Sequence, residues 1–261
     1  DVCSSDLRIG IESGRPALRS YPGFDRVRID VLERLYVAGG EPSVMPEVYE
    51  FMRQCISHGR TDFEFMINTN AAKFSERFLE LCSHFPRLGF SVSLDGVGKI
   101  NDYIRWPSQF ENIVANTHRL RSQGHSVSFI DVVSIYNVAS LGELLEFQDQ
   151  EFPGSPVQLQ YDIWRDDIQS AFNYPDNSAA LASLARCRQT NVYLNYSRGA
   201  KSIIDQLYAH YEQDPQCDLA KLQKFVDFNQ QLDTSRGHSL DRKSTRLNSS
   251  HIPLSRMPSS A

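Results

Sequence analysis

The sequence has few cysteines, no long apolar run and no cluster of basic residues. Only five of its 261 residues are cysteine, and their irregular spacing does not make a disulfide framework. No apolar stretch approaches the roughly 18 residues that a membrane helix needs. The formal net charge is -5, and no block of Lys and Arg offers counter-charges to a phosphate backbone. We therefore expect a cytoplasmic protein with no membrane segment and no strong nucleic-acid signal.

Both ends of the chain look foreign to the protein. Residues 1–7, DVCSSDL, are what one strand of a short-read sequencing adapter encodes, and 241–261 begins DRKSTRLNSSH, which the adapter's reverse complement encodes. A disordered Ser/Arg tail is the alternative for the second segment, but one duplex explains both ends. We therefore expect 1–7 and 241–261 to be adapter-derived and 8–240 to be native, with the native chain beginning upstream of Arg8.

Five apolar runs rich in β-branched and aromatic residues predict strands. Several are apolar at consecutive positions, as strands of a sheet covered on both faces are. The runs lie at 32–38, 63–67, 88–94, 127–135 and 157–163.

Segments with helical spacing separate these strands. Capping boxes, in which a Ser hydroxyl and an acid three residues on satisfy the first free amides, predict helix starts at Ser108 with Glu111 and at Ser140 with Glu143. The repeated alternation predicts right-handed crossovers and a parallel sheet, either an open doubly wound sheet or an α/β barrel. Two other apolar stripes comprise Val48, Phe51, Met52, Cys55 and Ile56, and Phe74, Phe78, Leu81, Cys82 and Phe85.

Beyond residue 163 the strand signal fades and helical stripes replace it. The stretch 164–178, which holds Pro175 and several Asp and Asn residues, is the predicted boundary. We expect a barrel portion over 8–164 and a helical C-terminal extension over 165–240. The stripes of the extension are Ile203, Ile204, Leu207, Tyr208 and Tyr211, then Leu219, Leu222, Phe225 and Val226.

The turn after the first predicted strand reads GGEP. Parallel α/β folds gather their binding loops at the carboxyl ends of their strands, so this turn is a candidate binding element. Gly39 and Gly40 let a ligand approach bare backbone, and Pro42 stiffens the turn. Glu41 offers a carboxylate to a ligand ammonium group.

Polar residues also follow the next two strands. Asn70 ends an NTN segment after the second strand, and Asp95 follows the third. Both can bond hydroxyl groups, and Arg105 further on can clamp a carboxylate with its fork of donors. Together with the GGEP turn, this set suits an amino-acid-bearing nucleoside.

Three motifs carry a resemblance to a known family. GGEP, then NTN, then SVSLDGVGKINDYIRWPSQFENI, each after a predicted strand, resemble the radical S-adenosylmethionine (radical SAM) enzymes, and more narrowly the twitch-domain-containing subgroup. The likeness covers most of 31–163, and FNQQLDTSRGHSL at 228–240 also looks like the end of those proteins. The resemblance implies an α/β fold, namely a partial (β/α)6 barrel that here lacks its first strand and cluster loop.

The resemblance also implies roles for individual positions. The GGEP turn would hold the methionyl amino group of S-adenosylmethionine, and the arginine would meet the methionyl carboxylate. Polar residues after later strands would lie near the ribose, the adenosine or the substrate. Each position has a structural alternative, such as a helix-start acid, a surface ion pair or a turn cap. The implied cofactor-binding set is Gly39, Gly40, Glu41, Pro42, Asn70, Ser93, Asp95, Arg105 and Asn137.

One family feature has no counterpart in this sequence. Members hold a 4Fe-4S cluster through a CxxxCxxC loop upstream of GGEP, and electron transfer from the cluster breaks a carbon–sulfur bond of S-adenosylmethionine to release a 5'-deoxyadenosyl radical. Cys3 lies in the adapter-derived segment, and 8–31 contain no cysteine. We therefore expect the cluster cysteines upstream of Arg8 and predict that this fragment by itself is inactive.

For the whole protein, the resemblance implies an electron donor such as flavodoxin or ferredoxin. The substrate is unknown, with a peptide or small molecule favoured. Two other functions stay open. One is a cluster-free nucleoside-binding module or pseudoenzyme on the same barrel, and the other is an unrelated α/β barrel enzyme that binds a phosphorylated ligand at Gly39 and Gly40.

The other reactive side chains favour structural roles. Cys55 and Cys82 fall on apolar helix stripes and are predicted core thiols, whereas Cys187 and Cys217 lack the CxxC partner that an accessory cluster needs. The histidines show no HxH or HExxH spacing, so we assign none of them to a metal. Three late aromatic residues are expected to pack on the barrel rim rather than to line a substrate cavity, namely Tyr136, Tyr161 and Trp164.

Overall fold

The computed structural model describes residues 24, 27–161, 167–196 and 198–236, which form two compact units. Of the described residues, the first unit holds those up to Leu94 together with Asn101–Ile130, and the second holds Asp95–Ile100 and those from Asp131 onward. The expected adapter-derived segments and Trp164 lie outside the described residues. Within those residues, no helix has the length and apolarity that crossing a membrane requires.

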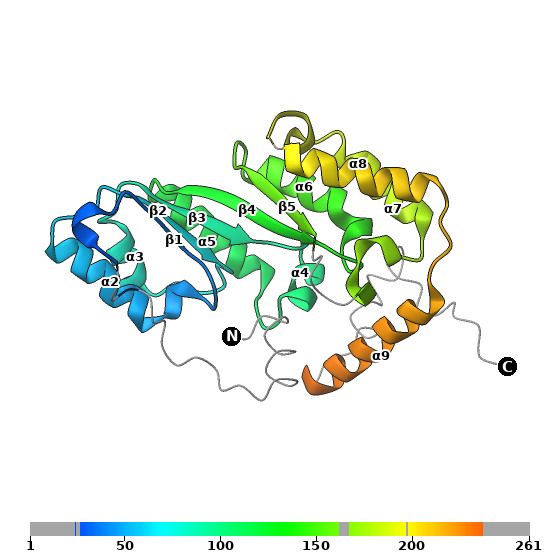
Figure 1. Cartoon of the computed structure of the whole chain (residues 1–261), viewed down its shortest axis with the longest axis horizontal. Helices are drawn as coiled ribbons and strands as arrows, with labels where there is room; N and C mark the ends of the chain where they lie inside the picture. The colour runs from blue at the N-terminus through cyan, green and yellow to red at the C-terminus, as the bar shows by residue number, and fades with distance from the viewer. Residues whose placement is uncertain (1–23, 25–26, 162–166, 197, 237–261) are drawn as a thin grey trace. The chain divides into compact units, whose positions relative to one another are not determined.

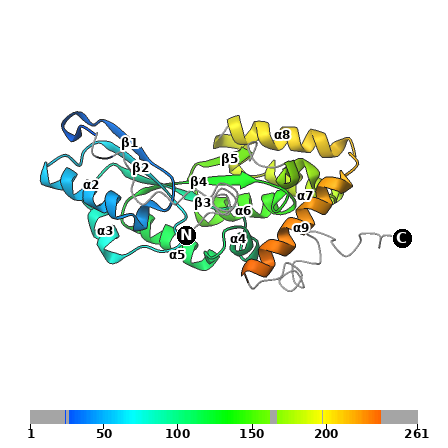
Figure 2. The ribbon, with the colours of Figure 1, turned by 60° about the horizontal axis from the view of Figure 1, so that its bottom comes forward.

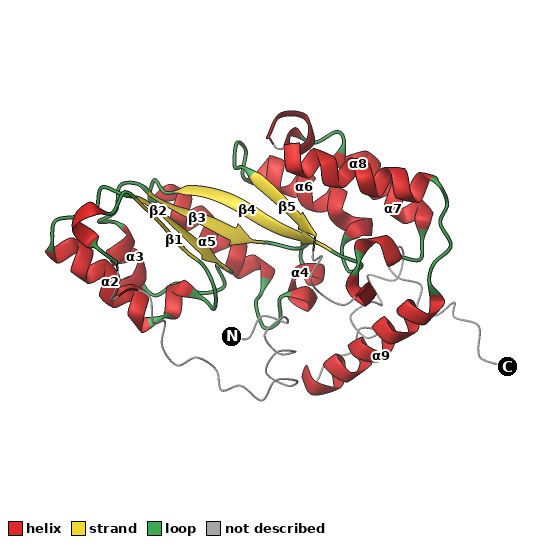
Figure 3. Ribbon diagram, viewed as in Figure 1, coloured by secondary structure: helices red, strands yellow, loops and turns green. Residues whose placement is uncertain are grey.

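Five parallel strands form a sheet in the order in which they occur along the chain (Figure 1). Each coincides with a predicted strand, and helices separate successive strands (Figure 3). This alternation confirms the predicted α/β class and the partial (β/α)6 topology. The strands are β1 Arg34–Val37, β2 Glu64–Thr69, β3 Leu88–Ser93, β4 Ser126–Val133 and β5 Val157–Tyr161.

The helices bury the apolar stripes that the spacing predicts. In α2, Val48 and Met52 are fully buried, and in α3 so are Phe78 and Cys82. The helices that separate strands are α2 Pro46–Ser57, α3 Glu76–Cys82, α4 Lys99–Ile104, α5 Phe110–Ser122 and α6 Leu141–Glu151. Three more follow β5, namely α7 Asn177–Cys187, α8 Arg198–Glu212 and α9 Leu219–Arg236.

In the first unit, the two faces of the sheet differ in chemistry. Figure 2 shows α2, α3 and α5 along one side of the strands. Side chains such as Phe65, Ile67 and Phe90 are fully buried, and they alternate along their strands with less buried or polar ones. The register sets Asn68 beside Ser91 on the alternate positions. One face is therefore an aromatic and aliphatic core, and the other carries less buried side chains, among them Met66 and Asn68.

The predicted capping box at Ser108 and Glu111 is wrong. Helix α5 begins at Phe110, and its N-cap residue is Gln109, whose side chain makes no capping bond. The carboxylate of Asp102 instead accepts a hydrogen bond from the Phe110 amide at 2.7 Å. A side chain eight positions earlier in the chain thus satisfies the amide that the serine was expected to satisfy.

Ser140 is the N-cap residue of α6, as predicted, but it makes no side-chain capping bond. The residues before the helix, Val138–Ser140, already form a 3-10 turn. The Ser140 hydroxyl donates back to the Asn137 carbonyl at 3.2 Å. The hydroxyl therefore stabilises the preceding turn, and the expected box with Glu143 does not form.

In the second unit, α6 and α7 pack closely at Gly142. A Cβ atom at this position would lie 2.5 Å from the Ser183 carbonyl oxygen and 2.7 Å from the Arg186 Cβ. The Gly142 amide donates to the Ser183 hydroxyl at 3.0 Å. Glycine is therefore required here by the close approach of two helices.

Candidate functional site

The GGEP turn leaves β1 through two consecutive glycines with positive φ. The φ angles are 96° at Gly39 and 58° at Gly40, a region that residues with a Cβ atom rarely adopt. Both glycines are exposed, and a Cβ at Gly40 would meet only the Met45 sulfur at 3.7 Å. Backbone conformation, and not lack of space, therefore accounts for the glycine at position 40.

The Glu41 carboxylate is buried, with 6% of the residue exposed, and it accepts three hydrogen bonds. One oxygen accepts from the Ser43 amide at 3.1 Å and from the Thr69 hydroxyl at 2.7 Å. The other accepts from the Asn70 amide at 2.7 Å. These bonds tie the turn after β1 to the end of β2. In this structure the carboxylate organises the loops, while its expected contact with a ligand ammonium stays a prediction.

Thr69 is a member of this cluster that sequence reasoning missed. Its hydroxyl donates to Glu41 and accepts from the Ala71 amide at 3.0 Å. The residue is 2% exposed and occupies a buried position at the end of β2, where its neighbours in the alternation are apolar. The sequence does contain a signal for this role: Thr69 is a polar residue at a core position, and a buried polar group needs a hydrogen-bond partner.

The loop after β2 contains an alanine in the left-handed region. Ala71 has φ of 50° and is fully buried. The Asn70 side chain accepts from the Ala72 amide at 2.8 Å, and the Asn116 side chain of α5 donates to the Ala71 carbonyl at 2.8 Å. Strain of this kind persists where surrounding contacts fix the backbone, and it concentrates at functional sites.

A second network extends the cluster toward α3. The Tyr49 hydroxyl donates to the Ser43 carbonyl at 2.7 Å and lies 2.9 Å from the Ser75 hydroxyl. Ser75 is the N-cap residue of α3 and accepts from the Phe78 amide. The start of α3 is therefore linked through Tyr49 to the same turn that Glu41 holds.

Two other predicted residues belong to the first unit. The Ser93 hydroxyl, at the end of β3, donates to the Asn68 side chain at 3.4 Å. Arg105 follows α4 and is partly buried, and its amide donates to the Asn101 carbonyl at 2.8 Å. Within this unit, a hydrogen bond thus joins Glu41 to Asn70, while Ser93 is bonded to a different asparagine.

Asp95 and Asn137 belong to the second unit, where they are bonded to each other. The Asn137 side chain donates to the Asp95 carbonyl at 2.9 Å and to the Val132 carbonyl at 2.8 Å, and it accepts from the Ser134 amide at 2.8 Å. The Asp95 carboxylate accepts from the Val132 amide at 2.8 Å. Asn137 is 1% exposed, so its amide has a structural role in this arrangement.

The cysteines of the described residues are free thiols, and no group of three metal-binding side chains occurs among those residues. Cys55 and Cys82 are fully buried, which confirms that they are core thiols. Burial raises the pKa of Cys55 to about 11 and raises that of Cys82 further. Cys187 is also fully buried and has a raised pKa. Such thiols are protonated at neutral pH.

The two described aromatic candidates pack against their neighbours. The Tyr136 hydroxyl donates to the Asn229 side chain at 2.8 Å, and its ring lies 4.9 Å from that of Phe225. The Tyr161 hydroxyl donates to the Ile203 carbonyl at 3.1 Å. Burial raises the pKa of both hydroxyls. Tyr136 thus contacts α9 and Tyr161 contacts α8, while their expected place on the barrel rim stays a prediction.

No family model matches the chain. An uncharacterized protein of Methanothermobacter thermautotrophicus is 31% identical over 114 residues, a match that covers 42% of this chain and 42% of that protein. The match therefore spans less than half the length of this relative.

Solved structures give more distant similarities. Streptococcus suis SuiB bound to S-adenosylmethionine has a TM-score of 0.45 and 16% identity, covering 66% of this chain and 35% of that one. A domain of pyruvate-formate lyase-activating enzyme from Bacteroides vulgatus has a TM-score of 0.41 and 14% identity, covering 69% and 95%. The anSMEcpe enzyme with bound AdoMet and a peptide has a TM-score of 0.48 and 15% identity, covering 62% and 48%.

Proposed function

We propose that this chain is the S-adenosylmethionine-binding portion of a radical SAM enzyme. The observation that carries the proposal is the GGEP turn, in which exposed glycines of positive φ are fixed to the end of β2 by the buried Glu41 carboxylate. Two consecutive residues without side chains leave main-chain polar groups open to a ligand ammonium. A turn that is already held in place binds its ligand without a further ordering cost.

The remaining residues of the proposed site follow from the resemblance. Arg105 would meet the methionyl carboxylate with its planar fork of donors, and Asn70 and Ser93 would lie near the ribose or the substrate. Asp95 is likewise proposed to lie near the ribose or the substrate, and Asn137 near the adenosine. Pro42 is buried at the start of the 3-10 turn Pro42–Val44 and fixes the chain direction after Glu41.

The 4Fe-4S cluster does not fit the described residues, because no three metal-binding side chains converge among them. We therefore assign the cluster to cysteines upstream of Arg8, as part of a twitch-domain protein. Bound there, the cluster would supply the electron for cleavage of S-adenosylmethionine. The proposal further includes an electron donor such as flavodoxin or ferredoxin, a peptide or small-molecule substrate, and a cytoplasmic, reducing location, which the free cysteines support.

A matched pair of glycine substitutions tests the binding site. Gly40 and Gly59 have similar φ angles, 58° and 66°, but only Gly40 lies in the GGEP turn, since Gly59 follows α2. Gly40→Ala and Gly59→Ala therefore carry the same backbone strain of about 1 kcal/mol. We expect S-adenosylmethionine binding, measured by calorimetry, to weaken at least about tenfold in Gly40→Ala and to be unchanged in Gly59→Ala.

Arg105→Ala separates this proposal from the phosphate-binding alternative. We expect it to weaken S-adenosylmethionine binding, because the methionyl carboxylate loses its partner. If the wild-type chain binds inorganic phosphate but not S-adenosylmethionine, and Gly40→Ala abolishes that phosphate binding, the proposal is wrong. Cleavage of S-adenosylmethionine by this chain after iron-sulfur reconstitution would contradict the expected inactivity of the fragment.

A further inference from the structure

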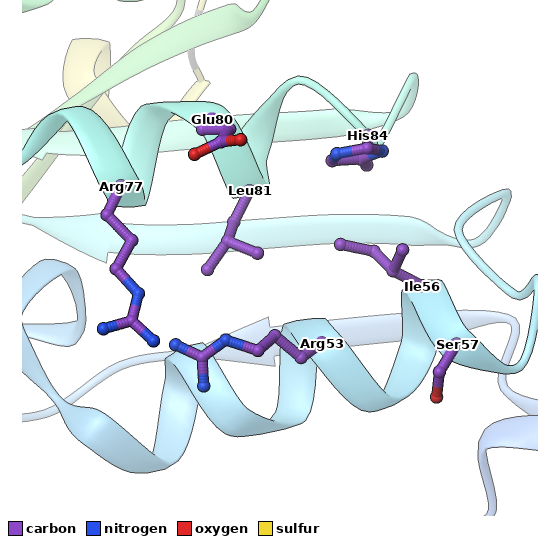
Figure 4. Close-up of a pocket in the computed structure, with 7 residues that line it drawn as sticks. All are labelled: Arg53, Ile56, Ser57, Arg77, Glu80, Leu81 and His84. Atoms are coloured by element: carbon purple, nitrogen blue, oxygen red, sulfur yellow. The ribbon is translucent and has the colours of Figure 1, made fainter.

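A hollow of about 350 Å³ lies between α2 and α3 in the first unit (Figure 4). Its volume is in the range of pockets that hold small ligands. None of its lining residues belongs to the GGEP turn or to the other proposed cofactor contacts. The lining residues are Arg53, Ile56, Ser57, Arg77, Glu80, Leu81 and His84.

Two arginines from different helices converge at one end of this hollow. Figure 4 shows the guanidinium groups of Arg53 and Arg77 turned toward one another. Arg53 pairs with Glu50 on its own helix at 3.2 Å, whereas Arg77 makes no hydrogen bond or ion pair with any residue that the structure describes. Two like charges that face each other repel, and an anion placed between them removes the repulsion and gains hydrogen bonds from both forks.

The position of Arg77 is supported by a fixed aromatic ring. Its guanidinium carbon lies 5.9 Å from the centre of the Tyr49 ring, within the range of a cation–π contact. The Tyr49 hydroxyl is in turn anchored on the Ser43 carbonyl at 2.7 Å. The anchored Tyr49 ring therefore restrains the Arg77 guanidinium, which lowers the entropic cost of binding a ligand.

The chemistry of the other lining residues restricts the ligand. Figure 4 shows Ile56 and Leu81 pointing into the hollow beside the arginines, so part of the ligand is apolar. Glu50 pairs with Arg53, and Glu80 also lines the hollow, so acidic groups reduce the positive charge there. This balance favours the single charge of a carboxylate over the nearly double charge of a phosphate group.

We propose that the hollow between α2 and α3 binds a carboxylate group carried on an apolar body. The carboxylate lies between Arg53 and Arg77, and the apolar body lies on Ile56 and Leu81. Two sources have this chemistry, a free aliphatic acid and an acidic residue next to an apolar one in a peptide. The inference does not depend on S-adenosylmethionine binding, because its residues are not in the proposed cofactor site.

Ligand-observed NMR titration with the full chain tests this site. The probes are hexanoate, its neutral isostere hexanamide, the capped dipeptide acetyl-Leu-Glu-amide, and inorganic phosphate. We expect hexanoate or the dipeptide to bind the wild-type chain, and hexanamide to bind at least about tenfold more weakly because it lacks the charge. The tighter of the two carboxylates identifies the source, free acid or peptide.

The matched variants are Arg77→Gln and Arg87→Gln. Arg87 is also an exposed arginine of the first unit, but it lies near Glu64 and does not line the hollow. We expect Arg77→Gln to weaken carboxylate binding about tenfold and Arg87→Gln to leave it unchanged. Both side chains are exposed, so neither change disturbs the core. The proposal is overturned if neither carboxylate binds, if Arg77→Gln binds like wild type, or if phosphate binds more tightly than both carboxylates.

Discussion

Two buried polar clusters, one in each unit, join neighbouring strand ends with different kinds of side chain. In the first unit, the Glu41 carboxylate collects donors from Ser43, Thr69 and Asn70. In the second, the Asn137 amide both donates and accepts, and it bonds only to main-chain groups of its surroundings and the Ser134 hydroxyl. The first cluster links the turn after β1 to the end of β2, and the second links the loop after β4 to Asp95, which follows β3.

The difference shows how a motif residue can organise a site without touching a ligand. Glu41 and Asn137 were both selected from the sequence as ligand contacts, and both side chains are engaged within the protein. Beside Glu41 the chain also presents two exposed glycines, whereas Asn137 is covered and 1% exposed. Exposed main chain next to a fixed carboxylate therefore distinguishes the stronger candidate site.

The largest expected effect comes from Asn137→Ala. The change leaves the Ser134 amide and the Asp95 and Val132 carbonyls without their buried partner, which destabilises the fold by about 3 kcal/mol. The free energy of unfolding is measured by urea denaturation. Asn195→Ala is the control, because Asn195 is exposed, and we expect it to change stability by less than about 0.5 kcal/mol. If Asn137→Ala changed the free energy of unfolding as little as Asn195→Ala, the hydrogen bonds of the second cluster would not be stabilising.

Glu41→Gln tests the first cluster. The amide keeps one acceptor oxygen but turns an NH2 group toward a donor, so we expect a loss of about 2 kcal/mol. The same denaturation measurement applies, with the exposed Glu33→Gln as the neutral control. A Glu41→Gln protein as stable as wild type would mean that the three short contacts to the carboxylate are not stabilising.

Ala71→Gly has a smaller effect of the opposite sign. Glycine adopts the left-handed conformation at φ 50° without the Cβ penalty, so we expect a gain of about 0.5 to 1 kcal/mol after the entropy cost of glycine is subtracted. Ala72→Gly is the control and is expected to destabilise. A loss of stability in Ala71→Gly would show that the methyl group's packing outweighs the backbone strain.

The smallest effect belongs to an exposed ion pair, which sets a baseline for the buried clusters. Hydrogen bonding to Arg186, at 2.9 Å, lowers the pKa of Glu146. The stabilisation is therefore present above the unfolded-state pKa of about 4.3 and is lost as pH falls through the lower folded-state pKa. Because both side chains are partly solvated, Glu146→Gln should cost about 0.5 kcal/mol at pH 7 and nothing near pH 2. Thermal unfolding at both pH values measures this, and a cost that persists at pH 2 would contradict it.

Much of the fold followed from local patterns. The apolar runs located all five strands, and the stripes located α2, α3, α8 and α9, because burial on a sheet or a helix face imposes a fixed period on the sequence. The GGEP segment was predicted as a turn after the first strand, and its two glycines have positive φ, a conformation that glycine adopts without strain.

Hydrogen-bond partners could not be read in the same way. Asp102, and not Ser108, satisfies the first amide of α5, and Thr69 reaches Glu41 across 28 positions of the chain. Helix α7 was not predicted, and its contact with α6 at Gly142 depends on the Ser183 carbonyl 41 positions away. These pairs form only when distant segments pack together.

The sequence by itself determined the α/β alternation, the strand positions and the glycine turn after β1, because the spacing of apolar residues and the backbone preference of each residue are local properties of the sequence. Only the tertiary structure decided that the Glu41 carboxylate is held by the end of β2, that Asn137 binds the Asp95 carbonyl from a distant loop, and that Arg53 and Arg77 face each other across two helices. Side-chain partners are chosen by three-dimensional proximity, and a buried polar group accepts whichever donor the packing places within reach.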